Sequence, residues 1–520
     1  MMKRRLPVLM AMMVLCILSI GAWLGQRVRL PGDYVSVAGA PRIEPDYTGS
    51  TIPYNIAPLN FNIRHKAEAY IVSIYPPDNS DSAINVASKS GSIVIDPGKW
   101  HRMLEASKGK ELVFSIYTRD AEGQWTRHGD IANHVSKHPI PGYLSYRHLK
   151  PTYNWWLDID ILQQSLENSK VSTIFDNAAS DHTCVNCHIV AAGNPQTMAM
   201  GFRSSENGVG TLIYSDGELK RISAKWGYTS WHPSGRLAAY SINKVRQFFH
   251  RTGLEIRDVV DLDSAIAYYS LEKGRAIKID ALTEKDYLET YPHFSPDGKY
   301  LYFCRAPILW EDRNTVPPKR FKEVRYSIMR ISYDVDTDTW GELEMVLSAE
   351  DTGKSLLIPR VSPDGRHMIF CMCNYGCFPI YQPSSDLYTM DLQTRQVRPL
   401  EILNSPYSES WHNYSNSGRW LVFSSKRQGG LFTRPHFSFI DDEGNAHKPF
   451  VLPQKDPEHY YKTLQTYSVP EFMVAPAAVS PRALSRIVQR KDRMIEVNQP
   501  ISGATKTYGA KTELEANDRE

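Results

Sequence analysis

The chain has 520 residues, which at about 150 residues per domain predicts two to four domains. Its composition, 42% hydrophobic and 22% charged, is that of a globular protein and excludes a mostly disordered, collagenous or polytopic membrane chain. The 60 basic and 57 acidic residues leave a net charge of +3, so there is no basic footprint for nucleic acid. The 7 cysteines are too few for a disulfide scaffold of this size.

Residues 1–25 have the pattern of an export signal. A basic stretch at residues 3–5 precedes an apolar run from Leu6 to Leu24. The length of this run lies between a cleaved signal and a membrane span of about 20 residues, so we predict either a signal peptide or a membrane anchor. In both cases the rest of the chain is expected in the cell envelope, on the periplasmic side of the inner membrane.

The next two segments are predicted to be a tether and a small β domain. Residues 26–58 contain five prolines and little periodicity, which is typical of a proline-rich tether. Short β-branched and aromatic runs at 69–75, 92–95 and 111–117 predict strands. We therefore expect residues 59–139 to form an immunoglobulin-like β-sandwich that acts as a spacer or docking module.

Residues 140–200 contain the strongest chemical signal. Cys184-Val-Asn-Cys187-His188 has the C-x-x-C-H spacing of c-type haem attachment, in which two thiols bind the porphyrin and the adjacent imidazole binds iron. A thioredoxin-like pair lacks a surrounding βαβ unit, and a zinc site has only His182 nearby as a further ligand. A structural disulfide is the third alternative. We predict one covalent haem c on Cys184 and Cys187, with His188 as the proximal iron ligand.

The rest of this segment is expected to be short and partly helical. Residues 158–169 are predicted to form one helix, and so few residues would bury a haem only by packing on a neighbouring domain. Met198 is predicted as the distal iron ligand, with Met200 next in order. The alternatives are that both methionines fill a strand face, or that the iron is open on one side and serves sensing or small-ligand chemistry.

The C-terminal half repeats one pattern four times, at residues 231–241, 294–304, 361–371 and 414–424. Each copy has a strand, a tight turn that ends in Gly, and an apolar strand that ends in a small residue. The turn glycines are Gly235, Gly298, Gly365 and Gly418. Four strands per unit at this period predict β-propeller blades. Residues 210–222 are expected to supply another blade, and a late strand at 467–473 to close the ring.

These segments resemble the TolB-type propeller repeat, whose hallmark is an aromatic-Ser-Pro-Asp-Gly hairpin followed by an apolar strand. Two copies depart from it, with His-Pro-Ser-Gly at 232–235 and Ser-Asn-Ser-Gly at 415–418. The resemblance covers roughly residues 200–475 and implies an all-β fold. We expect a five- or six-bladed TolB-like β-propeller over 201–478, preceded by a small β-sandwich and a short helical haem-binding segment. Residues 479–520 are polar and are predicted to be a disordered tail.

Two further sets of residues share a place in the repeat. Cys304 and Cys371 stand where other copies have Ser241 and Ser424, which predicts a slot for small packed side chains. Cys373 and Cys377 are expected to form a local disulfide in an oxidising compartment. Polar residues precede each turn at equivalent positions and are predicted to line the mouth of the propeller, for ligand recognition or only because such positions are wet: Ser230, His293, Arg360 and Asn413.

The whole chain is similar to bacterial proteins, of the Bacteroidetes type, that join a C-x-x-C-H segment to a TolB-like propeller. That resemblance implies an extracytoplasmic, membrane-tethered protein with one haem c and a redox or electron-transfer role. The alternatives are an envelope scaffold that binds a protein partner, with structural haem or none, and a haem enzyme with an open iron site. We expect a redox or envelope protein as partner and no nucleic acid. Hydrolase, zinc-protease and nucleotide-binding motifs are absent from the sequence, which favours a carrier or binding protein over an enzyme.

Overall fold

The computed structural model describes residues 28–150, 158–253, 257–282 and 284–498. These residues fall into two compact units, and the first comprises residues up to 49, residues 58–135 and residues 455–458. The remainder forms the second unit. The signal or anchor predicted at 1–25 lies outside the described residues. Within the described ranges no helix is long and apolar enough to cross a membrane.

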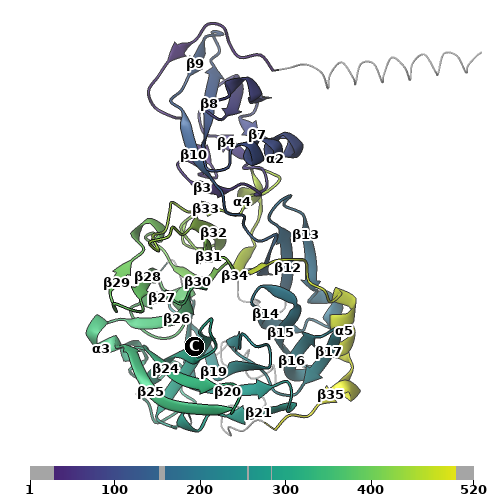
Figure 1. Cartoon of the computed structure of the whole chain (residues 1–520), viewed down its shortest axis with the longest axis vertical. Helices are drawn as coiled ribbons and strands as arrows, with labels where there is room; N and C mark the ends of the chain where they lie inside the picture. Colours follow the sequence, from purple (N-terminus) through teal and green to yellow (C-terminus); the bar gives the residue numbers. More distant parts are fainter. Residues whose placement is uncertain (1–27, 151–157, 254–256, 283, 499–520) are drawn as a thin grey trace, which may run out of the picture. The chain divides into compact units, whose positions relative to one another are not determined.

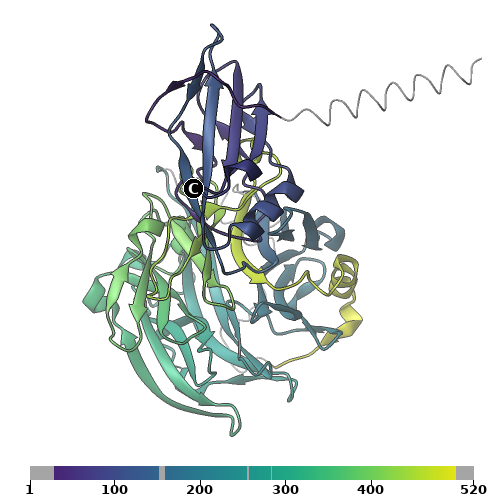
Figure 2. The ribbon, with the colours of Figure 1, turned by 45° about the horizontal axis from the view of Figure 1, so that its top comes forward.

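The first unit contains two sheets and one longer helix (Figures 1 and 2). In the larger sheet β8 pairs antiparallel with β5, β9 and β10, β6 pairs with β5, and β1 runs parallel to β9. The smaller sheet has the order β2-β4-β7. The bounds are β1 Val35–Ser36, β2 Ile43–Glu44, β4 Phe61–Ile63, β5 Ala69–Tyr75, β6 Ile84–Ser88, β7 Ser92–Ile93, α2 Pro97–Ala106, β8 Glu111–Arg119, β9 Trp125–Arg127 and β10 Ile131–Ser136.

The predicted strands of this unit are confirmed, but two of its features differ from the expectation. The strands β5, β7 and β8 lie at the predicted positions. Helix α2 was not expected; Asp96 caps it by accepting a hydrogen bond from the Lys99 amide, and its Trp100 is fully buried. The segment 26–58 is not a plain tether, because it contains β1, β2 and β3 (Thr51–Pro53). Strands of two or three residues are too short to show a periodicity.

The second unit is a β-propeller. Its six sheets follow one another along the chain, and in Figure 1 they surround a common centre with the strands β14, β26, β30 and β34 innermost. Five of the sheets run outward in chain order. Their strands are β14 Cys184–Ala191, β15 Asn194–Ser204, β16 Gly208–Ser215 and β17 Glu218–Ile222; β18 Thr229–Trp231, β19 Leu237–Phe249, β20 Arg257–Ser270 and β21 Arg275–Lys278; β22 Tyr287–Phe294, β23 Tyr300–Pro307, β24 Ser327–Asp334 and β25 Thr339–Leu347; β26 Ser355–Val361, β27 His367–Cys373, β28 Asp386–Asp391 and β29 Val397–Pro399; β30 Glu409–Tyr414, β31 Trp420–Ser425, β32 Arg434–Phe439 and β33 Phe450–Val451.

The sixth sheet closes the ring with strands from both ends of the unit. Its order is β13-β12-β11-β34, with β11 Tyr143–Leu149, β12 Ile159–Ser165, β13 Val171–Phe175 and β34 Thr466–Met473. The register places Leu144 opposite Phe472. The prediction that a late strand closes the ring is therefore confirmed.

The segment 140–200 is not the short helical segment that the sequence predicted. Residues 159–165 form strand β12 instead of a helix, because Ile159 and Ile161 alternate with half-buried residues and are themselves fully buried. The C-x-x-C-H motif lies on β14, the innermost strand of its sheet. The motif is thus part of the propeller.

The predicted disordered tail is also structured over its described part. Helix α5 (Pro481–Gln489) is capped by Ser480 and buries Leu484 and Val488, and β35 (Met494–Ile495) pairs with β17. The sequence carries the signals of this helix, a Ser-Pro start at 480–481 and apolar residues at 483, 484, 487 and 488, so the prediction of disorder over the described part of the tail is wrong. The shorter helices α3 (Ala349–Thr352) and α4 (His459–Lys462) lie in connections.

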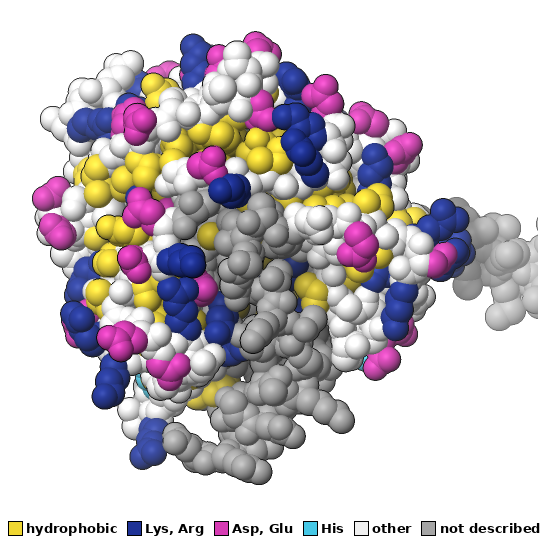
Figure 3. All heavy atoms as spheres, turned by 90° about the horizontal axis from the view of Figure 1, so that it is seen from below, with side chains coloured by type: hydrophobic (Ala, Val, Ile, Leu, Met, Phe, Trp, Pro, Cys, Tyr) yellow, Lys and Arg dark blue, Asp and Glu magenta, His cyan; other side chains and the backbone are white. Residues whose placement is uncertain are grey.

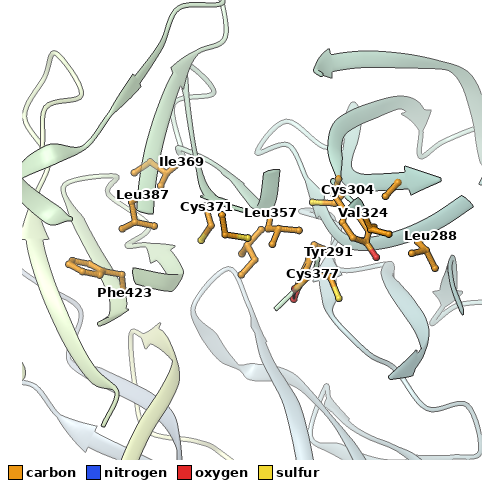
Figure 4. Close-up of a cluster of buried hydrophobic side chains, with 14 of the residues drawn as sticks. Leu288, Tyr291, Cys304, Val324, Leu357, Ile369, Cys371, Cys377, Leu387 and Phe423 are labelled. Atoms are coloured by element: carbon orange, nitrogen blue, oxygen red, sulfur yellow. Dashed lines mark hydrogen bonds between the residues drawn. The ribbon is translucent and has the colours of Figure 1, made fainter. Parts of the chain in front are cut away.

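Two cysteine predictions have different outcomes. Cys304 and Cys371 are fully buried, as are Ser241 and Ser424 at the equivalent positions, so the predicted packing slot is confirmed. Figure 4 shows Cys371 beside Leu357 within the large apolar cluster near the centre of the propeller. Cys373 and Cys377 are both free thiols, so the predicted local disulfide is not present. The Cys373 Sγ instead donates to the Tyr375 carbonyl over 3.4 Å.

Candidate functional site

A repeated bulge shapes the innermost strands of the propeller. In β14, β22, β26, β30 and β34 the pairing with the adjacent strand of the sheet shifts register, once in four of them and twice in β14. In each of the five strands a non-glycine residue with a left-handed backbone lies at one such shift. These bulge residues are Cys187 (φ 56°), Tyr291 (φ 55°), Ile358 (φ 56°), Trp411 (φ 49°) and Val469 (φ 51°). Because bulky residues seldom adopt this conformation, its recurrence in five sheets marks a built-in feature of the fold.

Aromatic side chains at this level meet in the centre of the ring. The rings of Tyr228 and Tyr291 have centroids 4.2 Å apart, and Trp411 lies 5.6 Å from Tyr228 and 5.9 Å from Tyr291. Tyr291 lies on β22 and Trp411 on β30, and Tyr228 lies just before β18. The centre of the propeller is therefore packed at the level of the bulges.

Cys187 is one of these bulge residues, and Cys184 lies three residues before it on the same strand, β14. Cys184 is 2% exposed and packs with Leu149 and Ile159. Its sulfur accepts a hydrogen bond of 3.0 Å from the Asn186 amide, whose oxygen in turn accepts one of 2.6 Å from Arg147. Both cysteines are free, and burial raises the pKa of the Cys187 thiol. The Cys187 thiol is thus protonated at neutral pH in this arrangement.

His188 is a buried imidazole without hydrogen bonds. It is 2% exposed, and neither ring nitrogen has a hydrogen-bond partner among the described residues. Burial, with a smaller contribution from the charge of nearby Arg147, lowers the pKa of His188 to about 3. The ring is therefore neutral and keeps a nitrogen lone pair available. A buried, neutral imidazole without hydrogen bonds is in the state required of a ligand to iron or another metal ion, which would then supply the missing partner.

His412 follows the bulge residue Trp411 in β30, just as His188 follows Cys187 in β14, and it therefore provides a comparison. Its Nε2 lies 2.9 Å from the Ile369 carbonyl and its Nδ1 lies 3.7 Å from the Cys371 sulfur. Burial lowers the pKa of His412 to about 3 as well. The surroundings therefore provide hydrogen-bond partners for His412 and none, among the described residues, for the equivalent His188. Over the described ranges, no three His, Cys, Asp or Glu side chains are grouped so that they could hold a metal ion.

Met198 and Met200 lie in the core beside this strand. Each is 1% exposed, and both belong to the apolar cluster that also contains Val190, opposite Met198 on β14. The structure therefore gives Met198 a packing role, which was the alternative interpretation of the sequence. Its role as distal iron ligand stays a prediction.

The predicted polar residues lie at equivalent positions on the innermost strands of neighbouring sheets, and we call this set, together with Glu471, the polar level of the ring. His293, Arg360 and Asn413 each come two residues after a bulge residue and are partly exposed, and Ser230 is buried and accepts a hydrogen bond of 3.0 Å from the Phe294 amide. The closing strand adds Glu471 at the same position, which the sequence reasoning missed. The signal was present, because Val-Pro-Glu-Phe at 469–472 repeats the pattern of Ile-Pro-Arg-Val at 358–361.

Glu471 and Arg360 carry opposite charges in this polar level. Burial raises the pKa of Glu471 to about 8, and Arg360 opposes this shift. One carboxylate oxygen accepts a hydrogen bond of 3.1 Å from the Val190 amide on β14. Burial lowers the pKa of Arg360, and it also lowers the pKa of His293, to which Arg360 adds. The level thus combines a weakened acid, a cation and a neutral imidazole.

On the face shown in Figure 3, basic and acidic side chains are interspersed. Elsewhere in the described residues many charged side chains pair locally, as Arg330 does with Glu344 over 2.6 Å.

Comparisons with known proteins give structural likeness only. No protein-family model matches the chain, and no curated protein matches its sequence. Among solved structures, TolB from Acinetobacter baumannii has a TM-score of 0.39 at 13% identity, over 69% of this chain and 78% of that one. Hydrazine synthase from Kuenenia stuttgartiensis has a TM-score of 0.37 at 9% identity, over 62% and 48%. Prolyl oligopeptidase B from Galerina marginata has a TM-score of 0.33 at 11% identity, over 65% and 43%. The fold that the sheet order defines is a β-propeller, and similarity at this level does not extend to function.

Proposed function

We propose that this protein is a cell-envelope scaffold whose propeller binds a segment of a partner protein at the polar level of the ring. The observation that carries the proposal is the set of polar side chains at one position in five neighbouring sheets: Ser230, His293, Arg360, Asn413 and Glu471. The export pattern of residues 1–25 and the resemblance of the repeats to TolB-type propellers support an envelope location.

The chemistry of this level suits a peptide segment. Arg360 offers several donors, Glu471 offers an acceptor, and Asn413 offers both. Arg360, His293 and Asn413 are partly exposed, and the buried Nε2 of His293 has no hydrogen-bond partner among the described residues. The partner segment is proposed to engage these groups. An extended peptide exposes both amides and carbonyls, which match such a mixed set of donors and acceptors.

A photo-crosslinking amino acid at position 413 tests this proposal in the native envelope. A single protein adduct is expected from this position, and it should disappear when Arg360→Met is added. Thr339, which is exposed on the outer strand β25, is the control position and should not give that adduct. The same adduct from both positions, or an adduct that persists in the Arg360→Met variant, would show that the polar level is not the binding site.

A second function is favoured by His188. We propose that Cys184 and Cys187 hold one haem c covalently, that His188 is its proximal ligand, and that the protein has a redox role. Supporting this are two free thiols and a neutral, unpartnered imidazole within five consecutive residues. A bound haem would supply one-electron chemistry at this place. The chain's own contribution is to keep His188 uncharged by burial and to fix Asn186 beside Cys184 through Arg147.

Expression with a haem c maturation system tests the haem directly. The purified protein should give a c-type pyridine haemochrome, and Cys184→Ala should reduce the covalently bound haem strongly. Cys371→Ala is the control, since it removes a buried thiol elsewhere in the propeller, and it should keep the haem. A wild-type protein without the haemochrome would disprove this second function and leave the crosslinking result untouched. Carbon monoxide binding to the reduced protein would then distinguish an open iron site from a six-coordinate carrier.

A further inference from the structure

Residues 481–497 cross the seam between the closing sheet of the propeller and the sheet that carries the C-x-x-C-H motif. Figure 1 shows α5 between β13 of the first sheet and β17 of the second, and it contacts both strands. Leu484 and Val488 of α5 belong to one apolar cluster with Phe175 of β13 and Val185 of β14. After the helix, β35 runs parallel to β17 and pairs with it. We call residues 481–497 the latch.

The latch is also bonded to the residues that lead directly into the motif. The Ser485 hydroxyl accepts a hydrogen bond of 2.8 Å from the Ser180 hydroxyl, and both side chains are buried. The side-chain amide of Gln489 donates to the Asp181 carboxylate over 3.1 Å. Because Asp181 is only three residues before Cys184, a movement of α5 is transmitted to the start of β14.

Cys184 is enclosed at this same seam. It is 2% exposed and packs with Leu149 of β11 and Ile159 of β12, which both belong to the closing sheet. The carbonyl of the preceding Thr183 accepts a hydrogen bond of 2.8 Å from the Asn177 side chain, and this bond is buried as well. A thiol that packs between two sheets can be reached from solvent only when the sheets separate at that point.

A buried charge lowers the cost of releasing the latch. Arg221 of β17 is 1% exposed, and its guanidinium donates to the carbonyls of Ile487 and Val488 in α5 and of Asn207. Its Nε has no hydrogen-bond partner among the described residues, and burial lowers its pKa. Docking of the latch therefore keeps a cation out of water that carbonyl dipoles compensate only in part, which offsets some of the gain from the apolar contacts. Release returns Arg221 to water, so local opening should require less free energy than unfolding of the propeller.

We propose that residues 481–497 form a releasable latch, and that Cys184 becomes accessible to thiol reagents through local release of this latch and not through unfolding of the propeller. The latch would thus decide when the first cysteine of the motif can be modified. This inference goes beyond the proposed function and does not depend on it, because it concerns access to a thiol in the chain without haem.

Site-resolved labelling of the full, haem-free chain with N-ethylmaleimide tests the latch. Leu484→Ala weakens only the docked state, in which this leucine is buried, so it should accelerate labelling of Cys184 by at least about tenfold. Cys371, which is fully buried in another sheet, is the internal reference and should keep its rate. Leu403→Ala is the matched control, since it truncates a fully buried leucine after β29 and should leave the labelling of Cys184 unchanged. Equal acceleration of Cys184 and Cys371 in Leu484→Ala, or an unchanged rate at Cys184, would overturn the proposal.

Amide hydrogen exchange of the wild-type chain provides a measurement that needs no variant. The amides of α5 and of residues 183–186 should exchange through one shared opening, with a smaller denaturant dependence than the amides of β27. Exchange of residues 183–186 only together with β27 would show that Cys184 is exposed by global unfolding. That result would overturn the proposal even if Leu484→Ala failed to fold.

Discussion

His188 and His412 show how a single position in a repeat can be used in two ways. Both follow a bulge residue with a left-handed backbone, and both are buried. His412 contacts a carbonyl and a thiol on β27 of the preceding sheet, whereas His188 has neither among the described residues. The difference lies in the neighbours that tertiary packing supplies and not in the local chain.

The burial of His188 predicts a pH-dependent stability in protein prepared without haem. The pKa of His188 is about 3 in the folded chain and about 6.5 when unfolded, so below about pH 6.5 the unfolded chain binds a proton that the folded chain does not. The free energy of unfolding should therefore fall as the pH falls from about 6.5 toward 3. His188→Gln should reduce this slope by up to about 1.4 kcal/mol per pH unit.

Urea unfolding between pH 7 and 5 measures this effect. Met198→Leu is the control, since a substitution without a titratable group in the same sheet shifts the whole curve and keeps its slope. An unchanged slope in His188→Gln would show that the imidazole is hydrated or charged in the folded state, which would contradict its burial.

At the scale of elements, the repeated turns connect the first two strands of each sheet, and two of these turns have glycines in different surroundings. Gly298 and Gly365 end equivalent turns with φ of 73° and 75°. In each turn the glycine amide donates to the carbonyl of the serine three residues earlier, over 2.9 Å and 2.8 Å. A Cβ at Gly298 would lie 2.4 Å from the His232 imidazole of the preceding sheet, whereas a Cβ at Gly365 would meet open space.

Alanine at these two glycines should therefore have unequal costs. Gly365→Ala carries only the left-handed backbone penalty and should lower the free energy of unfolding by about 1–2 kcal/mol. Gly298→Ala should cost more, because the His232 ring must also move and lose its hydrogen bond with the Gly298 carbonyl. Chemical denaturation of both variants checks the order. Equal losses would mean that the ring of His232 adjusts freely.

The elements that the sequence predicted are those with a strong local signature. The turns with Gly235, Gly298, Gly365 and Gly418 repeat a fixed chemistry, and β5 and β8 are long β-branched runs, so each could be placed without tertiary information. In contrast, β12 was predicted as a helix and α5 as disordered. The sequence of β12 has few apolar residues, whereas α5 carries helical signals, namely Ser480 at the N-cap and apolar residues at 483, 484, 487 and 488. The helix was therefore predictable, and only its packing against the neighbouring apolar cluster required the tertiary structure.

At the scale of the whole propeller, the ring depends on contact between the two ends of the unit. Strand β34 pairs with β11 over most of its length, and the Phe472 ring packs at a tilt against Phe437 of the neighbouring sheet, with centroids 5.9 Å apart. Phe472 is 3% exposed, so its side chain contributes to both interfaces. Opening the ring therefore exposes two sheets together.

Phe472→Ala should weaken both ends of the unit. A loss of about 3–5 kcal/mol in the free energy of unfolding is expected for a buried phenylalanine, and amide exchange in β11 and β34 should accelerate together. Tyr461→Ala, which removes an exposed aromatic side chain nearby in sequence, is the control and should leave exchange in β11 unchanged. Faster exchange in β34 alone would show that the closing strand frays without opening the ring.

The sequence by itself determined the all-β class, the repeated turns, the closing strand and the C-x-x-C-H motif, because each depends on residue types at fixed local spacing. Only the tertiary structure decided that the motif lies on an innermost propeller strand and that Glu471 lies near enough to Arg360 to interact electrostatically. These relations join residues far apart in the chain, and they arise because the curvature of the ring brings the same position of each sheet to a common centre. The charge states of His188 and Glu471 follow from the burial that results, which no local pattern encodes.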